Sequence, residues 1–111
     1  MRFEDQDTYT LVVQFEQALS EGRQPYYDVE DLELILEYYL ETGSYRQMRN
    51  ALALAQDIHP LAFVFKVKEV QLDIATKEYT KAQAKLNHLE GLNMRSVELL
   101  IARATILLDK P

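Results

Sequence analysis

The sequence predicts an all-α fold of short antiparallel helices, and three observations support this prediction. Apolar residues recur at the three- and four-residue spacing of an α-helix along most of the 111 residues. Candidate caps divide this pattern into six segments of about 13 residues, joined by links too short for anything but antiparallel packing of neighbours. Three glycines and three prolines are too few for a turn-rich β-sandwich.

Turn and capping residues set the bounds of the first two predicted helices. The first runs from about Asp7 to Glu21, and Gly22 is suited to end it. The second is capped by Asp28, runs to about Thr42 and ends at Gly43. The apolar stripe of the first helix is expected to consist of Leu11, Phe15, Ala18 and Leu19.

The remaining four helices follow from similar signals. Ser44 and Gln47 form a capping box for the third helix, and His59-Pro60 ends it because proline pushes the preceding residue out of the α region. Three further helices are expected at about 61–76, 78–90 and 97–109, with Gly91 ending the fifth and Ser96 capping the sixth.

The chain aligns with itself when it is shifted by 34 residues. Thr42 then falls on Thr76, Tyr45 on Tyr79 and Leu52 on Leu86, and other positions match by residue class. The lag matches both helix pairs and both turns. It divides the chain into a capping helix with its linker (1–28), repeat 1 (29–62), repeat 2 (63–96) and the first helix of a truncated repeat 3 (97–111).

With this period, the chain resembles the tetratricopeptide repeat (TPR) family. Gly43-Ser44-Tyr45 matches the turn between the paired helices, and Pro60 closes repeat 1. The departures are Lys66 and Glu69 at slots that are apolar in the family, and Met94 in place of the closing proline of repeat 2. The apolar slots of repeat 1 are filled by Leu32, Ile35, Leu36, Tyr39, Met48 and Leu52.

The resemblance implies a right-handed solenoid of αα-hairpins, with an N-terminal capping helix and about two and a half repeats. It also implies that the first helix of each repeat lines a concave groove that binds a partner segment. The most direct alternatives are another αα-solenoid and an irregular helical bundle.

Two sets of residues are candidates for this partner-binding groove. The first is an acidic stripe on the second predicted helix, which is either a solvated face or a docking surface for a basic segment. The second follows the same register on the fourth predicted helix, where core packing is the competing explanation. The stripe consists of Glu30, Glu33, Glu37 and Glu41, and the second set of Val64, Val67, Gln71 and Ile74.

The sixth predicted helix has apolar residues on nearly every side. A terminal helix with a polar outer face would be expected in a repeat array, because exposed apolar patches drive association. We therefore expect that the 111 residues belong to a longer array, that this helix is buried in a homodimer, or both. The candidate self-association face consists of Leu100, Ile101, Ala104, Leu107 and Leu108.

Composition and motifs argue against several classes of function. The net charge of −6 disfavours nucleic acid as a partner, and the absence of cysteine excludes disulfides and thiolate chemistry. No apolar run approaches the ~20 residues of a membrane helix, and the first ten residues do not read as a secretory signal, so a cytoplasmic protein is expected. His59 and His88 lack clustered ligands, and no nucleotide or hydrolase motif occurs, so neither a cofactor, a metal nor an enzymatic activity is expected.

The sequence therefore favours a protein-interaction scaffold or adaptor whose partner carries basic and apolar residues. Two alternatives stay open: the N-terminal regulatory domain of a longer, catalytic chain, and an oligomerisation module. Two further surfaces have mainly structural explanations, as packing and as a solubilising face. They are the tyrosines Tyr26, Tyr27, Tyr38 and Tyr39, and the lysines Lys77, Lys81 and Lys85.

Overall fold

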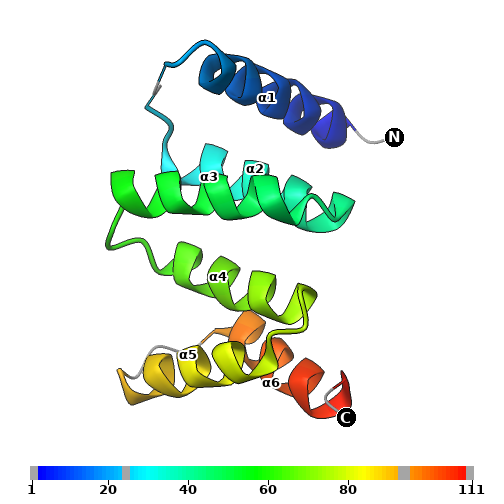
Figure 1. The fold of residues 1–111 in the computed structure, drawn as a ribbon, viewed down its shortest axis with the longest axis vertical. Helices are drawn as coiled ribbons and strands as arrows, with labels where there is room; N and C mark the ends of the chain where they lie inside the picture. The colour runs from blue at the N-terminus through cyan, green and yellow to red at the C-terminus, as the bar shows by residue number, and fades with distance from the viewer. Residues whose placement is uncertain (1–2, 24–25, 93–95, 110–111) are drawn as a thin grey trace. The chain divides into compact units, whose positions relative to one another are not determined.

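The computed structural model describes residues 3–23, 26–92 and 96–109, and every regular element in these ranges is an α-helix. The all-α prediction is therefore confirmed. The helices are α1 (Phe3–Ser20), α2 (Val29–Thr42), α3 (Tyr45–Ile58), α4 (Phe63–Ala75), α5 (Tyr79–Gly91) and α6 (Val97–Asp109) (Figure 1).

The chain forms two compact units that divide between Ala62 and Phe63. In the first unit, α2 packs against both α1 and α3. In the second unit, α4, α5 and α6 all contact one another. The division falls at the junction between repeats 1 and 2 of the sequence, so each unit contains one whole helical hairpin and one additional helix.

Local capping interactions explain why several helices begin and end where the sequence predicts. The Asp28 side chain accepts a hydrogen bond from the Asp31 N–H at 2.8 Å and caps α2. Ser96 Oγ accepts a hydrogen bond from the Leu99 N–H at 3.2 Å and caps α6. Gly22 adopts the left-handed conformation just after α1, at φ 73°, where a glycine is the residue least strained.

Three local predictions are wrong. The Ser44 hydroxyl does not cap α3, because it makes a 2.9 Å hydrogen bond with the Thr42 hydroxyl instead. Helix α4 begins at Phe63 rather than Leu61, because the chain first closes a turn in which the Ala62 N–H donates to the His59 carbonyl. Helix α1 begins four residues earlier than predicted, since the residues before Asp7 include no helix breaker.

The turns of the two hairpins repeat the same hydrogen bonds 34 residues apart. The Ser44 N–H donates to the Tyr39 carbonyl at 2.8 Å, and the Glu78 N–H donates to the Asp73 carbonyl at 2.8 Å. The same lag relates the hydroxyl hydrogen bonds of Thr42 to the carbonyls of Tyr38 and Tyr39 and those of Thr76 to the carbonyls of Leu72 and Asp73.

Backbone conformation and helix bounds show the same period. Gly43 (φ 72°) and Lys77 (φ 62°) occupy corresponding left-handed positions in the two turns. The helices α2, α4 and α6 begin at residues 29, 63 and 97, and α3 and α5 begin at residues 45 and 79. The repeat of 34 residues is therefore a property of the structure as well as of the sequence.

Helix α1 is held against α2 by apolar packing and by a partly buried hydrogen bond. The Tyr39 hydroxyl donates to Glu16 Oε2 at 2.7 Å, and burial together with this carboxylate raises the pKa of Tyr39. Among the described side chains of α1, Val12, Phe15 and Ala18 are buried, whereas Leu11 is half-buried and Leu19 is exposed. The predicted stripe is therefore confirmed at Phe15 and Ala18 and wrong at Leu19, and it omitted Val12. The buried residues of α2 and α3 are Leu32, Ile35, Leu36, Tyr39, Met48, Ala51, Leu52 and Ala55.

The second unit has one continuous apolar core to which all three of its helices contribute. Leu86 of α5 is fully buried within it, and Phe63, Ile74 and Tyr79 pack against its edge. The core consists of Val67, Val70, Ala82, Leu86, Leu89, Leu99, Ala102 and Ile106.

Exchanging the residues at the two left-handed positions tests the repeated turn. We expect Gly43→Lys to lower the free energy of unfolding by about 1–2 kcal/mol, because a side chain adds backbone strain at this φ although the space around it is open. We expect Lys77→Gly to be neutral or stabilising by up to about 1 kcal/mol, since it removes that strain at the cost of chain entropy. Urea denaturation measures both, and equal losses would contradict the equivalence of the two turns.

Candidate functional site

The acidic stripe lies on the side of α2 away from the buried residues. Glu30 and Glu41 are exposed, and Glu33 and Glu37 are half-buried. Leu34 interrupts the stripe, with 47% of its surface exposed. The structure thus brings the predicted carboxylates together on one helix and adds an exposed leucine that sequence reasoning did not assign to the site.

A groove between α1 and α2 opens beside this stripe. It has a volume of about 670 Å³. Leu11 and Leu34 supply apolar surface, while Asp7 and Asp31 supply carboxylates. The remaining lining residues are Thr8, Thr10 and Gln14. Sequence reasoning missed this groove because it depends on how α1 sits against α2, although the helical spacing of Asp7, Leu11 and Gln14 placed these three on one face.

The environment of Asp31 in this groove disfavours the charged form of its carboxyl group. Burial raises the pKa of the Asp31 carboxyl, and the nearby Asp28 carboxylate raises it further. Its backbone N–H is used by the helix cap, but its carboxylate faces groove-lining side chains that include no cation. A positively charged ligand group would therefore find an uncompensated carboxylate here.

The second half of the predicted partner groove lies largely within the core of the second unit. Val67 is buried in that core and Ile74 packs against it, while Val64 and Gln71 are half-buried. Core packing, the competing explanation, accounts for Val67 and Ile74. The assignment of these four residues to a partner-binding groove stays a prediction.

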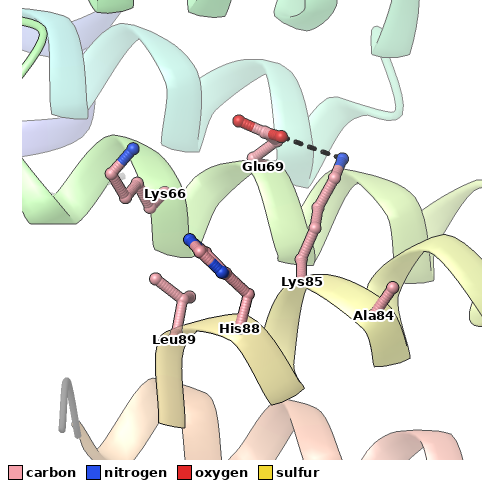
Figure 2. Close-up of a pocket in the computed structure, with 6 residues that line it drawn as sticks. All are labelled: Lys66, Glu69, Ala84, Lys85, His88 and Leu89. Carbon is pink, nitrogen blue, oxygen red and sulfur yellow. Dashed lines mark ion pairs between the residues drawn. The ribbon is translucent and has the colours of Figure 1, made fainter. Parts of the chain in front are cut away.

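A smaller pocket of about 240 Å³ lies between α4 and α5 (Figure 2). Glu69 reaches from α4 toward Lys85 of α5, and His88 and Leu89 lie one turn further along α5, on the side of Lys66 (Figure 2). The pocket contains charges of both signs, so its electrostatics do not select one class of ligand.

A cluster of charges at this pocket, formed by Glu69, Asp73 and Lys85, replaces an apolar layer of the first hairpin. Lys85 Nζ lies 2.6 Å from Asp73 Oδ2 and 2.9 Å from Glu69 Oε1. The positions 34 residues earlier hold Ile35, Tyr39 and Ala51, which are all buried. An ion cluster therefore joins α4 to α5 where apolar packing joins α2 to α3, which explains the departure from the repeat pattern at Glu69.

This cluster also changes the interpretation of the predicted basic stripe. Burial lowers the pKa of Lys85, but the hydrogen bonds to Asp73 and Glu69 outweigh it, and the pKa is raised overall. Lys77 lies in the turn before α5, and Lys81 pairs with Glu78 at 2.9 Å. The three lysines thus have three different environments and do not form one solubilising face.

Helix α6 presents a wide apolar face to solvent. Its buried side consists of Leu99, Ala102 and Ile106, which contribute to the core of the second unit. Arg103 anchors its flank to α5 through an ion pair with Glu90. The large apolar residues of the opposite face have exposed fractions between 59% and 85%; they are Val97, Leu100, Ile101, Leu107 and Leu108. Ala104, the remaining member of the candidate self-association face, is also exposed.

Histidine and tyrosine side chains are used in packing within the first unit. His59 Nε2 lies 2.8 Å from the Tyr27 carbonyl oxygen, and the ring centroids of Tyr26 and His59 are 5.4 Å apart. Tyr38 instead packs against Tyr9 of α1. The four tyrosines of the predicted aromatic patch therefore separate into two groups. Among the described side chains, no three potential ligands gather closely enough to hold a metal ion.

Comparisons with known proteins add no family to this geometry. The chain matches no protein-family model, no curated protein and no solved structure. In the described ranges, no helix is long and apolar enough to cross a membrane.

Removing the cation of the ion cluster tests its structural role. We expect Lys85→Met to lower the free energy of unfolding by about 2 kcal/mol or more, because Asp73 would keep a buried, uncompensated charge. Lys81→Met, which removes an exposed pair, should change it by less than about 1 kcal/mol. Because folding raises the pKa of Lys85 above its ordinary value of 10.5, the cluster's contribution is fully present below that value and is lost as the pH rises through the higher pKa of the folded state.

Thermal and urea denaturation at pH 7 and above pH 10 measure these differences. Adding Asp73→Leu to Lys85→Met should recover part of the loss, since the buried carboxylate is then absent. Equal effects of Lys85→Met and Lys81→Met would contradict the structural role of the cluster.

Proposed function

We propose that this chain is a protein-interaction module, with an architecture similar to the tetratricopeptide repeat. The exposed apolar face of α6 is the observation that carries the proposal. Five large apolar side chains on one face of a helix form a patch of the kind that marks protein-interaction surfaces. The repeated hairpin turns support the TPR-like architecture, because this family is built from such hairpins at the same period.

The energetics of burial explain why this face favours a partner. Fully burying one leucine or isoleucine side chain contributes about 1.5–3 kcal/mol. Five such residues could therefore supply several kcal/mol to an interface, even after the entropic cost of association is subtracted. These five side chains are not part of the core of the second unit, to which α6 contributes Leu99, Ala102 and Ile106.

The acidic stripe on α2 supports a second contact with the same kind of partner. The TPR resemblance places the first helix of a repeat on the inner, ligand-binding side, and Glu30 and Glu41 are accessible. We therefore expect the partner to carry lysine or arginine together with apolar residues. The proposed role is that of a cytoplasmic scaffold or adaptor.

The α6 face also favours a second candidate function, oligomerisation, in which another copy of the chain covers Leu100 and Leu107. This would suit a regulatory or oligomerisation domain within a longer protein. The two candidates differ in what occupies the face, so one experiment can separate them.

Charge substitutions on α6 provide that experiment. We expect Leu100→Glu with Leu107→Glu to abolish binding of a hydrophobic dye. We also expect it to weaken partner binding or self-association at least about tenfold, because charges replace two apolar side chains that the interface would bury. Both residues are exposed, so the fold should be retained. Ala53→Glu with Leu61→Glu, at exposed positions of the first unit, is the matched control.

Sedimentation at micromolar concentration then distinguishes the candidates. A wild-type dimer that the α6 variant converts to monomer supports oligomerisation. A monomer whose α6 residues, replaced by photo-crosslinking residues, link to another protein supports a partner-binding module. A wild-type monomer that neither binds the dye nor crosslinks to a protein at these positions would contradict both.

A further inference from the structure

The repeat register explains why a groove exists between α1 and α2. On α6, the residues Leu99, Ala102 and Ile106 are buried because both α4 and α5 pack against that helix. The residues 68 positions earlier on α2 are Asp31, Leu34 and Tyr38. Among the described helices of the first unit, α1 is the one that packs against this side of α2. Two helices therefore cover this face on α6, whereas one helix covers the corresponding face on α2.

The single covering helix protects only part of that face. The Tyr38 ring packs against Tyr9 of α1, with centroids 6.2 Å apart. Asp31 and Leu34 instead line the groove of about 670 Å³, and Leu34 is 47% exposed. The volume lies within the range of ligand sites, and Leu11 and Leu34 give it apolar walls.

The charge of the first unit restricts what can fill this groove. Residues 1–62 contain 12 acidic and four basic residues, a net charge of −8. Asp7 and Asp31 contribute carboxylates to the groove itself, and Glu30 lies beside it on α2. Such a surface attracts cationic segments and repels acidic ones.

We propose that the groove between α1 and α2 binds an amphipathic helix of a partner protein, which carries lysine or arginine beside an apolar stripe. The apolar side chains of the bound helix pack on Leu11 and Leu34, and its lysine or arginine side chains face Asp7 and Asp31. The bound helix takes the place that α4 has beside α6. The proposal rests on the proposed function in one respect, that the ligand is a protein segment, but it uses a site separate from the α6 face.

A cation at this position would relieve the electrostatic cost that burial and Asp28 impose on the Asp31 carboxylate. A second copy of the chain fits less well through its exposed apolar helix, because the exposed acids of α6 are Glu98 and Asp109. These would add negative charge to an acidic groove.

A designed peptide serves as the probe. It is a capped peptide of about 16 residues, long enough to form a helix, with leucines at helical spacing and lysines on both flanks. Its counterpart carries glutamate in place of every lysine. We expect the lysine peptide, and not the glutamate peptide, to shift the backbone amide resonances of Thr8, Leu11 and Leu34 in a ¹⁵N-labelled sample of the full chain. The affinity should fall as salt is raised from about 0.05 to 0.5 M.

Matched variants test the groove against charge attraction in general. Asp31→Asn and Leu34→Gln should each weaken binding about threefold to tenfold. Asp57→Asn removes one exposed carboxylate of the same unit, and Leu61→Gln removes one exposed leucine, both outside the groove. These controls should leave the affinity within about twofold. Circular dichroism melts confirm that each variant is folded, as expected for substitutions at incompletely buried positions.

Several results would overturn the proposal. They are equal weakening by the groove variants and their controls, equal binding of the two peptides, and shifts confined to other surfaces. If the shifts cluster on α6 and disappear with Leu100→Glu and Leu107→Glu, the proposal fails while the proposed function stands. If dimerisation protects the groove amides and the peptide cannot compete, a second copy is the occupant and the proposal is wrong.

Discussion

The tight left-handed turn between paired helices is the constraint from which the rest of the structure follows. At the turns that contain Gly43 and Lys77, two and three residues respectively separate one helix from the next, so the paired helices must lie antiparallel. The backbone bonds from Ser44 to Tyr39 and from Glu78 to Asp73 close this turn in the same way. Each hairpin then buries one face of its first helix against its second. The other faces of the first helices are left for neighbouring elements or ligands.

The two hairpins show that the turn is more strictly conserved between repeats than the chemistry of the layer beneath it. Ile35, Tyr39 and Ala51 form an apolar layer in one hairpin, and Glu69, Asp73 and Lys85 form an ion cluster at the same positions in the other. A buried ion pair stabilises less than apolar packing of the same volume, but its removal on one side is costly. The second hairpin therefore depends on a specific charge arrangement where the first depends on apolar packing, with one hydrogen bond from Tyr39 to Glu16 of α1.

Helix positions could be predicted from sequence because caps and apolar spacing are local signals. Asp28, Gly43 and Ser96 act as their residue types suggest. Ser44 does not, because the Thr42 hydroxyl competes for its side chain. The site was harder to predict, since it depends on which helix covers which face. Val67 has the spacing of a groove residue and the burial of a core residue. Nothing in the sequence of α2 alone indicates that Leu34 borders a groove formed with α1.

The candidate binding surfaces arise where the packing of the repeat is incomplete. Both α2 and α6 have apolar or half-apolar surface that the helices packed against them do not cover. On α6 this uncovered surface consists of valine, leucine and isoleucine side chains and is open to solvent. The buried face of α6 corresponds, 68 residues earlier, to Asp31, Leu34 and Tyr38 of α2. Helix α1 covers only part of these three side chains. The two helices thus carry residues of different chemistry at equivalent positions. This difference is the basis on which we propose different partners for the two faces: an apolar surface for α6, and a cationic amphipathic helix for α2.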